Sequence, residues 1–156
     1  MAGMKTEGFM YKHILIPTDG STLSQKAIEA GLEFARESHA RVTAFTAVPE
    51  YQIPSEVELM AKRAVSLEQY EQRAKQVAHD TLEPVEQRAK SAGVDCDVDY
   101  ALSDQPFDAI IRAAEKHGCD LIFMASHGRR GISALIHGSQ TQGVLTHSTI
   151  PTLVYR

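Results

Sequence analysis

The sequence has few cysteines and no long apolar run. Its 156 residues include two cysteines, Cys96 and Cys119, whose spacing matches no zinc-ligand pattern. Both lie in apolar, strand-like contexts, so we expect buried free thiols and a reducing compartment. No apolar run reaches the roughly 20 residues of a membrane-spanning helix, and the first ten residues lack an apolar secretory segment. We therefore expect a cytoplasmic protein with no membrane partner.

The sequence also has no excess of positive charge and no motif for fast nucleotide hydrolysis. Its 16 Lys and Arg against 20 Asp and Glu give a net charge of −4, which argues against a nucleic-acid partner, because broad binding needs a basic face. The P-loop pattern Gly-x-x-x-x-Gly-Lys-Ser/Thr is absent. His127, His137 and His147 recur every ten residues, a spacing that does not place them on one helical face. We therefore expect no metal site made of side chains.

The chain reads as one domain in which strands and helices alternate. We expect a flexible lead-in over residues 1–10 and a single domain over residues 11–156. Short apolar runs between turn residues predict strands at His13–Pro17, Arg41–Val48, Val94–Ala101, Asp120–Met124 and Thr152–Tyr155. Apolar residues at helical spacing predict a helix capped by Ser21 or Thr22, and further helices at Glu56–Lys90, Pro106–Lys116 and Ser139–His147.

Several residues should mark helix ends. Pro84 should cost the long predicted helix a hydrogen bond or cause a kink, and Gly93 should end it. Ser103 or Asp104 should cap the helix that starts at Pro106.

The order of these elements predicts the fold class. Alternation of strand and helix predicts an α/β fold, a single doubly wound, Rossmann-like domain with a mainly parallel five-stranded sheet and helices on both faces. The continuously apolar strand at Asp120–Met124 should be central in this sheet. Such sheets bind ligands at the carboxyl ends of their strands, near the switch in strand order.

The first predicted strand ends in polar turn residues at that edge. Thr18 and Asp19 follow Pro17, and Gly20 and Ser21 complete the turn. Asp19 has two interpretations from the residues alone. It accepts hydrogen bonds from ribose hydroxyls, as acidic residues do in other nucleotide folds, or it caps the following helix from a tight turn.

A long polar segment follows the fourth predicted strand. It reads "MASHGRRGISALIHGSQTQGVL" over Met124–Leu145. Gly128 lets the backbone turn close to a bound group, and Gly138 and Ser139 open the last helix, whose free amides favour phosphate. The hydroxyl of Thr141 adds a donor. Two phosphate-binding segments therefore frame one crevice.

The charged residues of this segment leave alternatives open. Arg129 and Arg130 either close over phosphates, contact a partner, or form a solvated surface pair. His127 lies where a phosphate would bind, and no nucleophile pairs with it as a general acid–base site would require.

Four stretches together resemble the universal stress protein family: "ILIPTDGS", "MASHGRRG", "HGSQTQGVL" and "IPTLVYR". The resemblance covers about residues 10–156. The nucleotide-binding branch of the family shows Gly, two residues, Gly, nine residues, then Gly and Ser or Thr. Here Gly128, the nine-residue gap and Gly138-Ser139 are present, and Ala125 replaces the first glycine. If this position has ordinary dihedral angles, binding survives with some loss; if it needs a positive φ, binding fails.

The resemblance implies ATP as ligand, with Mg²⁺ or Mn²⁺ on its phosphates. Pro17, Thr18 and Asp19 would flank adenine and ribose, and Ala47 and Val48 would meet the adenine through backbone atoms. The remaining implied contacts come from the long segment and the last helix: Met124, Ala125, His127, Gly128, Arg129, Gly138, Ser139, Gln140 and Thr141.

The resemblance also implies a homodimer in which the last strand pairs with its partner. The sequence allows this, because Pro151 opens an apolar strand that would be a liability as a free edge. The expected function is that of an ATP-binding stress-response or signalling module with little or no turnover and an unidentified protein partner. The alternatives are a dimeric interaction module that has lost nucleotide, an adenylating or ATP-hydrolysing enzyme, a flavin-binding sheet of the flavodoxin type, and a different adenine nucleotide as ligand.

Overall fold

The computed structural model describes residues 10–126 and 139–156. Its centre is a five-stranded sheet in the order β3-β2-β1-β4-β5, with every neighbouring pair parallel. The strands are β1 (His13–Pro17), β2 (Arg41–Val48), β3 (Cys96–Leu102), β4 (Leu121–Ala125) and β5 (Thr152–Tyr155). The predicted doubly wound α/β fold is therefore confirmed.

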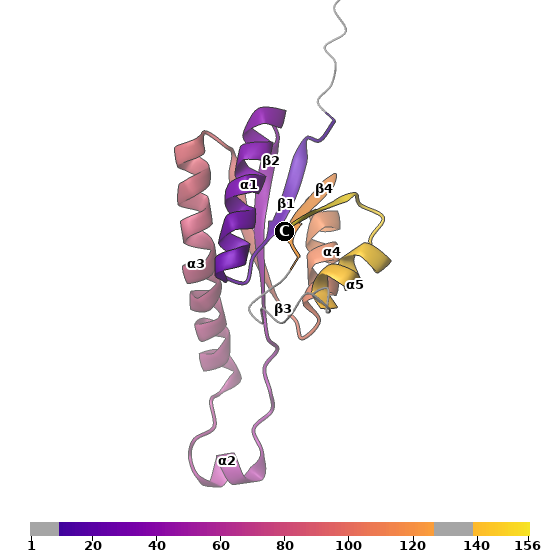
Figure 1. Ribbon diagram of the computed structural model, residues 1–156. Coiled ribbons are helices and arrows are strands. Elements are labelled where there is room, and N and C mark those ends of the chain that lie inside the picture. The colour runs from indigo at the N-terminus through magenta and orange to yellow at the C-terminus, as the bar shows by residue number, and fades with distance from the viewer. Residues whose placement is uncertain (1–9, 127–138) are drawn as a thin grey trace, which may run out of the picture.

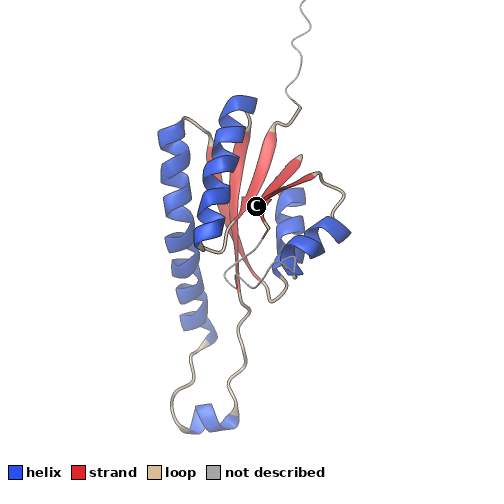
Figure 2. Cartoon of the chain, in the orientation of Figure 1, coloured by secondary structure: helices blue, strands red, loops and turns tan. Residues whose placement is uncertain are grey.

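Helices cover both faces of this sheet (Figures 1 and 2). They are α1 (Thr22–Ser38), α2 (Glu56–Met60), α3 (Leu67–Ala92), α4 (Pro106–Lys116) and α5 (Ser139–His147). Helices α1 and α3 lie on one face, and α4 and α5 lie on the other. Among the described residues, no helix combines the length and apolarity that crossing a membrane requires.

The core is divided by the sheet into two apolar layers. Successive residues of a strand point to opposite faces. Ile14 and Ile16 accordingly pack with the layer under α1 and α3, whereas Leu15 packs with Phe45 in the layer under α4. All three strand residues have no exposed surface. This double burial explains why β1 reads as a continuous apolar run.

Strand β4 is internal but not central. It pairs with β1 on one side and with β5 on the other, so β1 holds the middle of the sheet. The prediction that the fourth strand is central is therefore wrong. A continuous apolar run reports burial on both faces, and in a five-stranded sheet the three inner strands share that property.

The predicted helix over Glu56–Lys90 is two helices, α2 and α3. Each begins with a capping box, in which a serine side chain accepts a hydrogen bond from the backbone N–H three residues on, and the serine backbone N–H donates to the side chain of that residue. Ser55 does this for α2 and Ser66 for α3. Between them Lys62 has a left-handed φ of 51°, which ends α2. Helix propensity alone predicted one continuous helix because it overlooked the second serine.

The other predicted helix ends have mixed outcomes. Ser21 caps α1, as predicted, and Gly93 ends α3 with a φ of 71°. Helix α3 continues through Pro84. The residue before α4 is Gln105, and its side chain makes no capping hydrogen bond, so the prediction of Ser103 or Asp104 as the cap is wrong.

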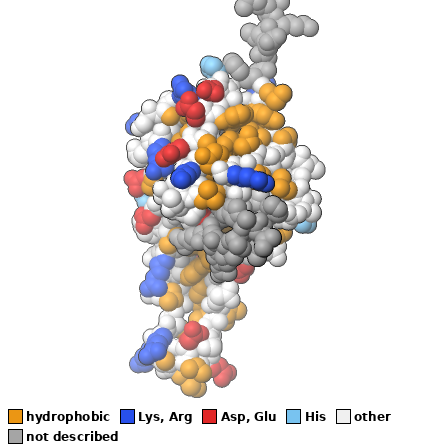
Figure 3. All heavy atoms as spheres, viewed as in Figure 1, with side chains coloured by type: hydrophobic (Ala, Val, Ile, Leu, Met, Phe, Trp, Pro, Cys, Tyr) orange, Lys and Arg blue, Asp and Glu red, His pale blue; other side chains and the backbone are white. Residues whose placement is uncertain are grey.

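Residues 49–66 leave the sheet and return to it as a long excursion with α2 at its tip (Figure 1). Helix α2 has no buried residue. Ile53, Val57 and Met60 are 89%, 75% and 83% exposed, and Figure 3 shows hydrophobic side chains at this end of the molecule. The excursion therefore adds little to the core.

Candidate functional site

The turn after β1 is held by the hydroxyl group of Thr18. Its backbone N–H donates to the carbonyl oxygen of Phe45 at 2.8 Å, which extends the β1–β2 ladder by one residue. Its Oγ1 accepts from the N–H of Gly20 at 3.1 Å and from the hydroxyl of Ser24 at 2.5 Å. Gly20 has a φ of 78°, a conformation that favours glycine. Thr18 therefore shapes the turn through a buried side chain.

Asp19 and Ser21 each accept a backbone hydrogen bond at the start of α1. Oδ1 of Asp19 accepts from the N–H of Ser21 at 2.9 Å, and Oγ of Ser21 accepts from the N–H of Ser24 at 3.2 Å. The helix cap is thus Ser21, and Asp19 orders the turn before it. The Asp19 side chain is half-buried at the carboxyl edge of the sheet, where a carboxylate can accept hydrogen bonds from sugar hydroxyls.

Strand β2 runs past the end of β1 and leaves part of its edge open. The ladder between them ends at Pro17 and Phe45, whereas β2 continues against β3 to Val48. Phe45 accepts from Thr18, so its backbone groups point toward β1, and by alternation those of Ala47 point the same way. The N–H and C=O of Ala47 therefore point to the β1 side of β2, beyond the last residue of the β1–β2 ladder.

Val48 differs from its neighbour. Its carbonyl oxygen accepts from the N–H of Ser103 at 2.8 Å, so its backbone points toward β3. Its side chain is buried with Ala74 and Ala78 of α3. Of the two predicted backbone contacts, Ala47 therefore directs its backbone groups past the end of β1, whereas Val48 directs its backbone toward β3 and buries its side chain.

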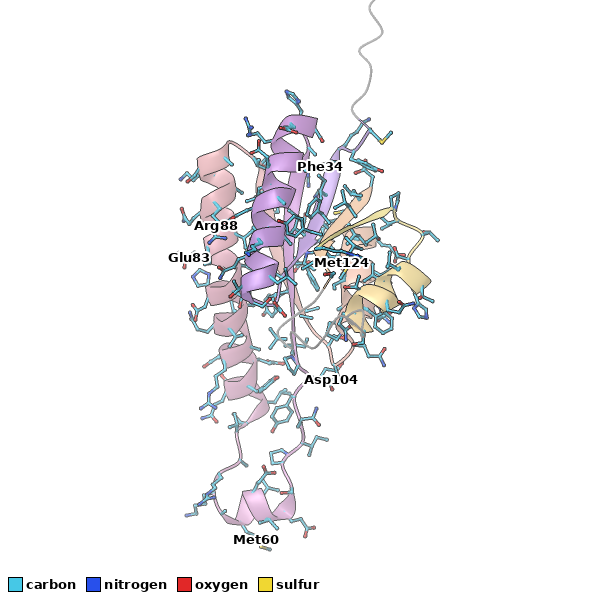
Figure 4. The ribbon with its side chains drawn as sticks, viewed as in Figure 1. Phe34, Met60, Glu83, Arg88, Asp104 and Met124 are labelled. Carbon is cyan, nitrogen blue, oxygen red and sulfur yellow. The ribbon has the colours of Figure 1, made fainter. Side chains whose placement is uncertain are left out.

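The end of β4 explains how an alanine fits at the first motif position. Met124 is buried, and Figure 4 shows it in the middle of the molecule. Ala125 is the last strand residue and pairs with Tyr155 of β5. Among the described non-glycine residues, positive φ angles occur at His39 and Lys62, so Ala125 has a negative φ. The backbone at this position does not require glycine.

The start of α5 is tied to the end of β4. Ser139, its first residue, is exposed, whereas Thr141 is buried. The hydroxyl of Thr141 donates to the carbonyl oxygen of Ala125 at 3.1 Å. Oε1 of Gln140 accepts from the backbone N–H of Phe107 at 2.7 Å, which joins the start of α5 to the start of α4. The amino end of α5 therefore lies beside the carboxyl end of β4.

Four predicted contacts lie outside the described residues: His127, Gly128, Arg129 and Gly138. The other predicted contacts come from the ends of β1, β2 and β4 and the start of α5. These ends share the carboxyl edge of one parallel sheet. The strand order reverses between β1 and β4, so the described contacts flank the switch point where doubly wound sheets bind ligands.

Two residues of this arrangement were missed from the sequence. Ser24 supports Thr18, and its place three residues after the cap Ser21 was an available signal. The backbone N–H of Phe107 donates a hydrogen bond to the side chain of Gln140, 33 residues away in the sequence, and no local pattern predicts this contact.

The cysteines offer neither a nucleophile nor a metal ligand. Cys119 is buried, as predicted, but Cys96 is half-buried because it lies in the edge strand β3. Burial raises the pKa of each thiol to about 11, so both are protonated at neutral pH and are poor nucleophiles. Within residues 10–126 and 139–156, no group of three or more His, Cys, Asp or Glu side chains could hold a metal ion.

A separate hollow of about 590 Å³ lies between the end of β3 and α4. Two ion pairs occur at its wall, Arg112–Asp108 at 2.8 Å and Lys116–Asp99 at 3.0 Å. Asp104, at the end of β3 in Figure 4, accepts from the backbone of Glu50 at 2.9 Å. None of the predicted contacts that the structure describes lines this hollow. Its charges are largely paired with one another, so it offers little for a ligand.

Comparison with known proteins decides the family. Residues 10–156 match the Universal stress protein family. The chain belongs to this family. It is 31% identical over 150 residues to Universal stress protein MJ0531 of Methanocaldococcus jannaschii, covering 94% of this chain and 83% of the relative.

Solved structures of family members share the fold. The structure of MJ0577 matches with a TM-score of 0.76 and 24% identity, covering 93% of this chain and 95% of that one. A universal stress protein from Archaeoglobus fulgidus in complex with dAMP matches with a TM-score of 0.65 at 15% identity, covering 94% and 98% of the two chains. One from Arabidopsis thaliana with AMP bound matches with a TM-score of 0.62 at 17% identity, covering 92% and 90%.

Proposed function

We propose that this universal stress protein binds ATP at the carboxyl edge of its sheet and acts in the cytoplasm as a nucleotide-dependent stress-response module with little or no turnover. The observation that carries the proposal is the convergence of the β1 turn, the open edge of β2 and the β4–α5 junction at the switch point of the sheet. The AMP and dAMP complexes of structural relatives support an adenine nucleotide as the ligand.

Ala47 provides the chemistry for recognising adenine. Its N–H and C=O both point to the β1 side, beyond the end of β1, so one residue offers a donor and an acceptor together. The Watson–Crick edge of adenine carries a matching acceptor, N1, and a matching donor, the N6 amine. Guanine presents a carbonyl and a protonated nitrogen at the same places and would meet like groups. The proposal therefore includes a preference for adenine over guanine.

The sugar would bind on the β1 side of the switch point, and the phosphates would bind on the β4–α5 side. Asp19 would accept from ribose hydroxyls. The free N–H groups at the start of α5 and the hydroxyl of Ser139 would donate to the phosphates, together with Gly128 and Gly138. The divalent ion, Mg²⁺ or Mn²⁺, would bind through phosphate oxygens.

We infer slow or absent turnover from the ionisable groups in the described part of the site. Among the described predicted contacts, Asp19 is the one ionisable side chain, and its Oδ1 already accepts from Ser21. Fast hydrolysis needs a group that positions the attacking water and cations that stabilise the phosphoryl group. ATP would then act as a switch ligand whose binding changes a surface that a protein partner recognises.

We also propose a homodimer through β5. This strand pairs only with β4 among the described strands, and its four residues are all half-buried. Leu153 and Tyr155 are partly buried against the core layer under α1, as Tyr11 and Phe34 are, and Figure 3 shows hydrophobic side chains gathered on this part of the surface. An open apolar edge is a liability that pairing with a second copy removes.

Nucleotide release and titration test the ligand. Freshly purified protein is denatured and the supernatant is resolved by ion-exchange chromatography. The nucleotide-free protein is then titrated with Mg-ATP and Mg-GTP by calorimetry. We expect co-purified adenine nucleotide or micromolar ATP binding, and weaker binding of GTP. Absence of both nucleotide and heat would reject ATP binding and favour an interaction module that works without nucleotide.

A further inference from the structure

The hydroxyl of Thr141 is fully used inside the protein. The side chain belongs to the first turn of α5 and the residue is 5% exposed. Its Oγ1 donates to the carbonyl oxygen of Ala125 at 3.1 Å and also approaches that of Ser126 at 3.4 Å. A threonine hydroxyl has one hydrogen, which these two acceptors share. It has none left to donate to a phosphate oxygen, although phosphate binding is the role that the motif suggests for it.

The side chain of Gln140 is also engaged. Its Oε1 accepts from the N–H of Phe107 at 2.7 Å, in the first turn of α4. The N–H groups of a first turn have no partner within their own helix, and Gln105 before α4 supplies no side-chain cap. Gln140 therefore provides the acceptor that α4 lacks. This contact fixes the start of α5 against the start of α4.

The end of β4, to which Thr141 donates its hydrogen bond, is also hydrogen-bonded to β5. The N–H of Ser126 donates to the carbonyl oxygen of Tyr155 at 2.8 Å, at the end of β5. The end of β4 is therefore fixed between β5 and α5. Ala125, whose carbonyl accepts from Thr141, is the residue that stands in place of the motif glycine.

We propose that Thr141 and Gln140 are positioning residues for the nucleotide phosphates and do not contact them. Together they set the place of Ser139 and of the first-turn N–H groups of α5 relative to the end of β4. The start of α5 and the end of β4 can bind phosphates together only at the correct separation. If the hydrogen-bond donors were displaced by about 1 Å, most of the benefit of their preorganisation would be lost. This inference rests on the proposed ATP function and assigns the residues that keep its phosphate subsite in register.

The first experiment replaces Thr141 and compares ATP with adenosine. Thr141→Val keeps the shape and removes the hydroxyl, and Thr141→Ser keeps the hydroxyl. Thr146→Val is the matched control, because Thr146 is an exposed threonine of the same helix. Calorimetry at a temperature where each variant is folded gives the dissociation constants of Mg-ATP and of adenosine, which lacks phosphates.

We expect Thr141→Val to weaken ATP binding about tenfold, the effect of losing one buried hydrogen bond, and to leave adenosine binding unchanged. Thr141→Ser should keep the ATP affinity of the wild type, and Thr146→Val should change neither ligand. The ratio of ATP to adenosine affinity is the decisive readout, because a general loss of stability would not change it.

Gln140→Met provides a second variant in case Thr141→Val does not fold. Methionine has a similar length but cannot accept the hydrogen bond from Phe107. Its matched control is Gln142→Met, at an exposed glutamine of the same helix. We expect Gln140→Met to weaken ATP severalfold without affecting adenosine, and Gln142→Met to have no effect.

The outcomes separate this inference from the function on which it rests. A wild-type protein that binds neither ATP nor adenosine rejects the proposed function, and the positioning role is rejected with it. If the wild type binds both ligands and the variants bind ATP normally, the positioning role alone is overturned. The same holds if the variants lose ATP and adenosine affinity equally. Failure of serine to restore ATP binding would overturn the role of the Thr141 hydroxyl.

Discussion

Gly143 of α5 lies directly against the ring of Phe107 of α4. A Cβ atom at Gly143 would lie 2.5 Å from Cγ of Phe107 and 2.8 Å from its Cβ. His147 holds the same ring from one turn further along α5, with ring centroids 5.3 Å apart. The two helices can therefore approach this closely only because residue 143 has no side chain.

Gly143→Ala should lower the free energy of unfolding although alanine is the better helix former. Overpacking a well-packed contact costs about 1–3 kcal/mol, and the gain in helix propensity offsets about 1 kcal/mol. The 2.5 Å approach places the cost at the upper end of this range, so we expect a net loss of about 1–2 kcal/mol in urea denaturation. Gln142→Ala is the control, and because Gln142 is exposed, this change should be neutral or stabilising. A Gly143→Ala protein as stable as the wild type would show that Phe107 yields without cost.

Ala125→Gly should change ATP affinity by less than about threefold. Ala125 has a strand conformation with a negative φ, so restoring the motif glycine relieves no backbone strain. The same change should lower the free energy of unfolding by about 0.5–1 kcal/mol, because glycine gains more freedom in the unfolded chain. Calorimetric titration and urea denaturation measure the two effects. ATP binding that becomes tenfold or more tighter would show instead that the alanine methyl group obstructs the ligand.

Local sequence signals predicted most of the fold for a physical reason. The strands at Arg41–Val48 and Thr152–Tyr155 and the helix at Ser139–His147 have the predicted bounds, because each apolar run ends at residues that break or cap it. The order of strands within the sheet was not predictable in the same way. Ile14–Ile16 and Leu121–Met124 are both continuously apolar, and only pairing shows which strand is central.

In the candidate site, too, local contacts could be predicted from the sequence and tertiary contacts could not. The turn at Thr18 and Asp19 could be placed at the end of the first strand from the sequence, since its residues are adjacent in the chain. The hydrogen bonds of Thr141 and Gln140 could not be predicted, because their partners Ala125 and Phe107 lie 16 and 33 residues away in the sequence. Sequence patterns show which side chains are available, whereas tertiary contacts decide which of them are already engaged.

His13 should make the protein less stable in mild acid. It is 6% exposed, and its Nε2 lies 2.7 Å from Oγ1 of Thr43. Burial, followed by electrostatic repulsion from Arg41 and His117, lowers the pKa of His13, and these effects outweigh the hydrogen bond with the backbone of His117 and the opposing charge of Asp120. The unfolded chain, in which His13 has an ordinary pKa of about 6.5, therefore binds more protons than the folded protein in this range.

The resulting stability is fully present above about pH 6.5 and is lost as the pH falls from there through the lowered pKa of His13. Urea denaturation at several pH values between 5 and 8 measures this slope, and it avoids the carboxylate range, where Asp99, with its lowered pKa, would titrate. His13→Asn should flatten the slope. His79→Asn is the control, because the side chain of His79 is 61% exposed, and it should leave the slope unchanged. An equally steep slope in His13→Asn would assign the effect to another group.

Val154→Pro should dissociate the proposed homodimer and leave the fold intact. Ile122 of β4 donates to the carbonyl oxygen of Pro151, just before β5, and Ser126, just after β4, donates to that of Tyr155, so the odd-numbered residues here direct their backbone groups toward β4. By alternation, the N–H of Val154 points to the open edge, where proline is tolerated within a sheet. Proline at this position therefore removes a donor from the edge and none from the β4–β5 ladder.

Sedimentation equilibrium distinguishes a chain of 17.2 kDa from its dimer. We expect a dimer for the wild type and for Val154→Ala, which keeps the N–H, and a monomer for Val154→Pro. Circular dichroism should show the same secondary structure in all three proteins. If Val154→Pro remains dimeric, the copies associate through another surface, and the apolar edge of β5 must be protected by other means. A monomeric wild type would reject the dimer itself, while ATP binding at the opposite side of β4, beside β1, would remain open to its own test.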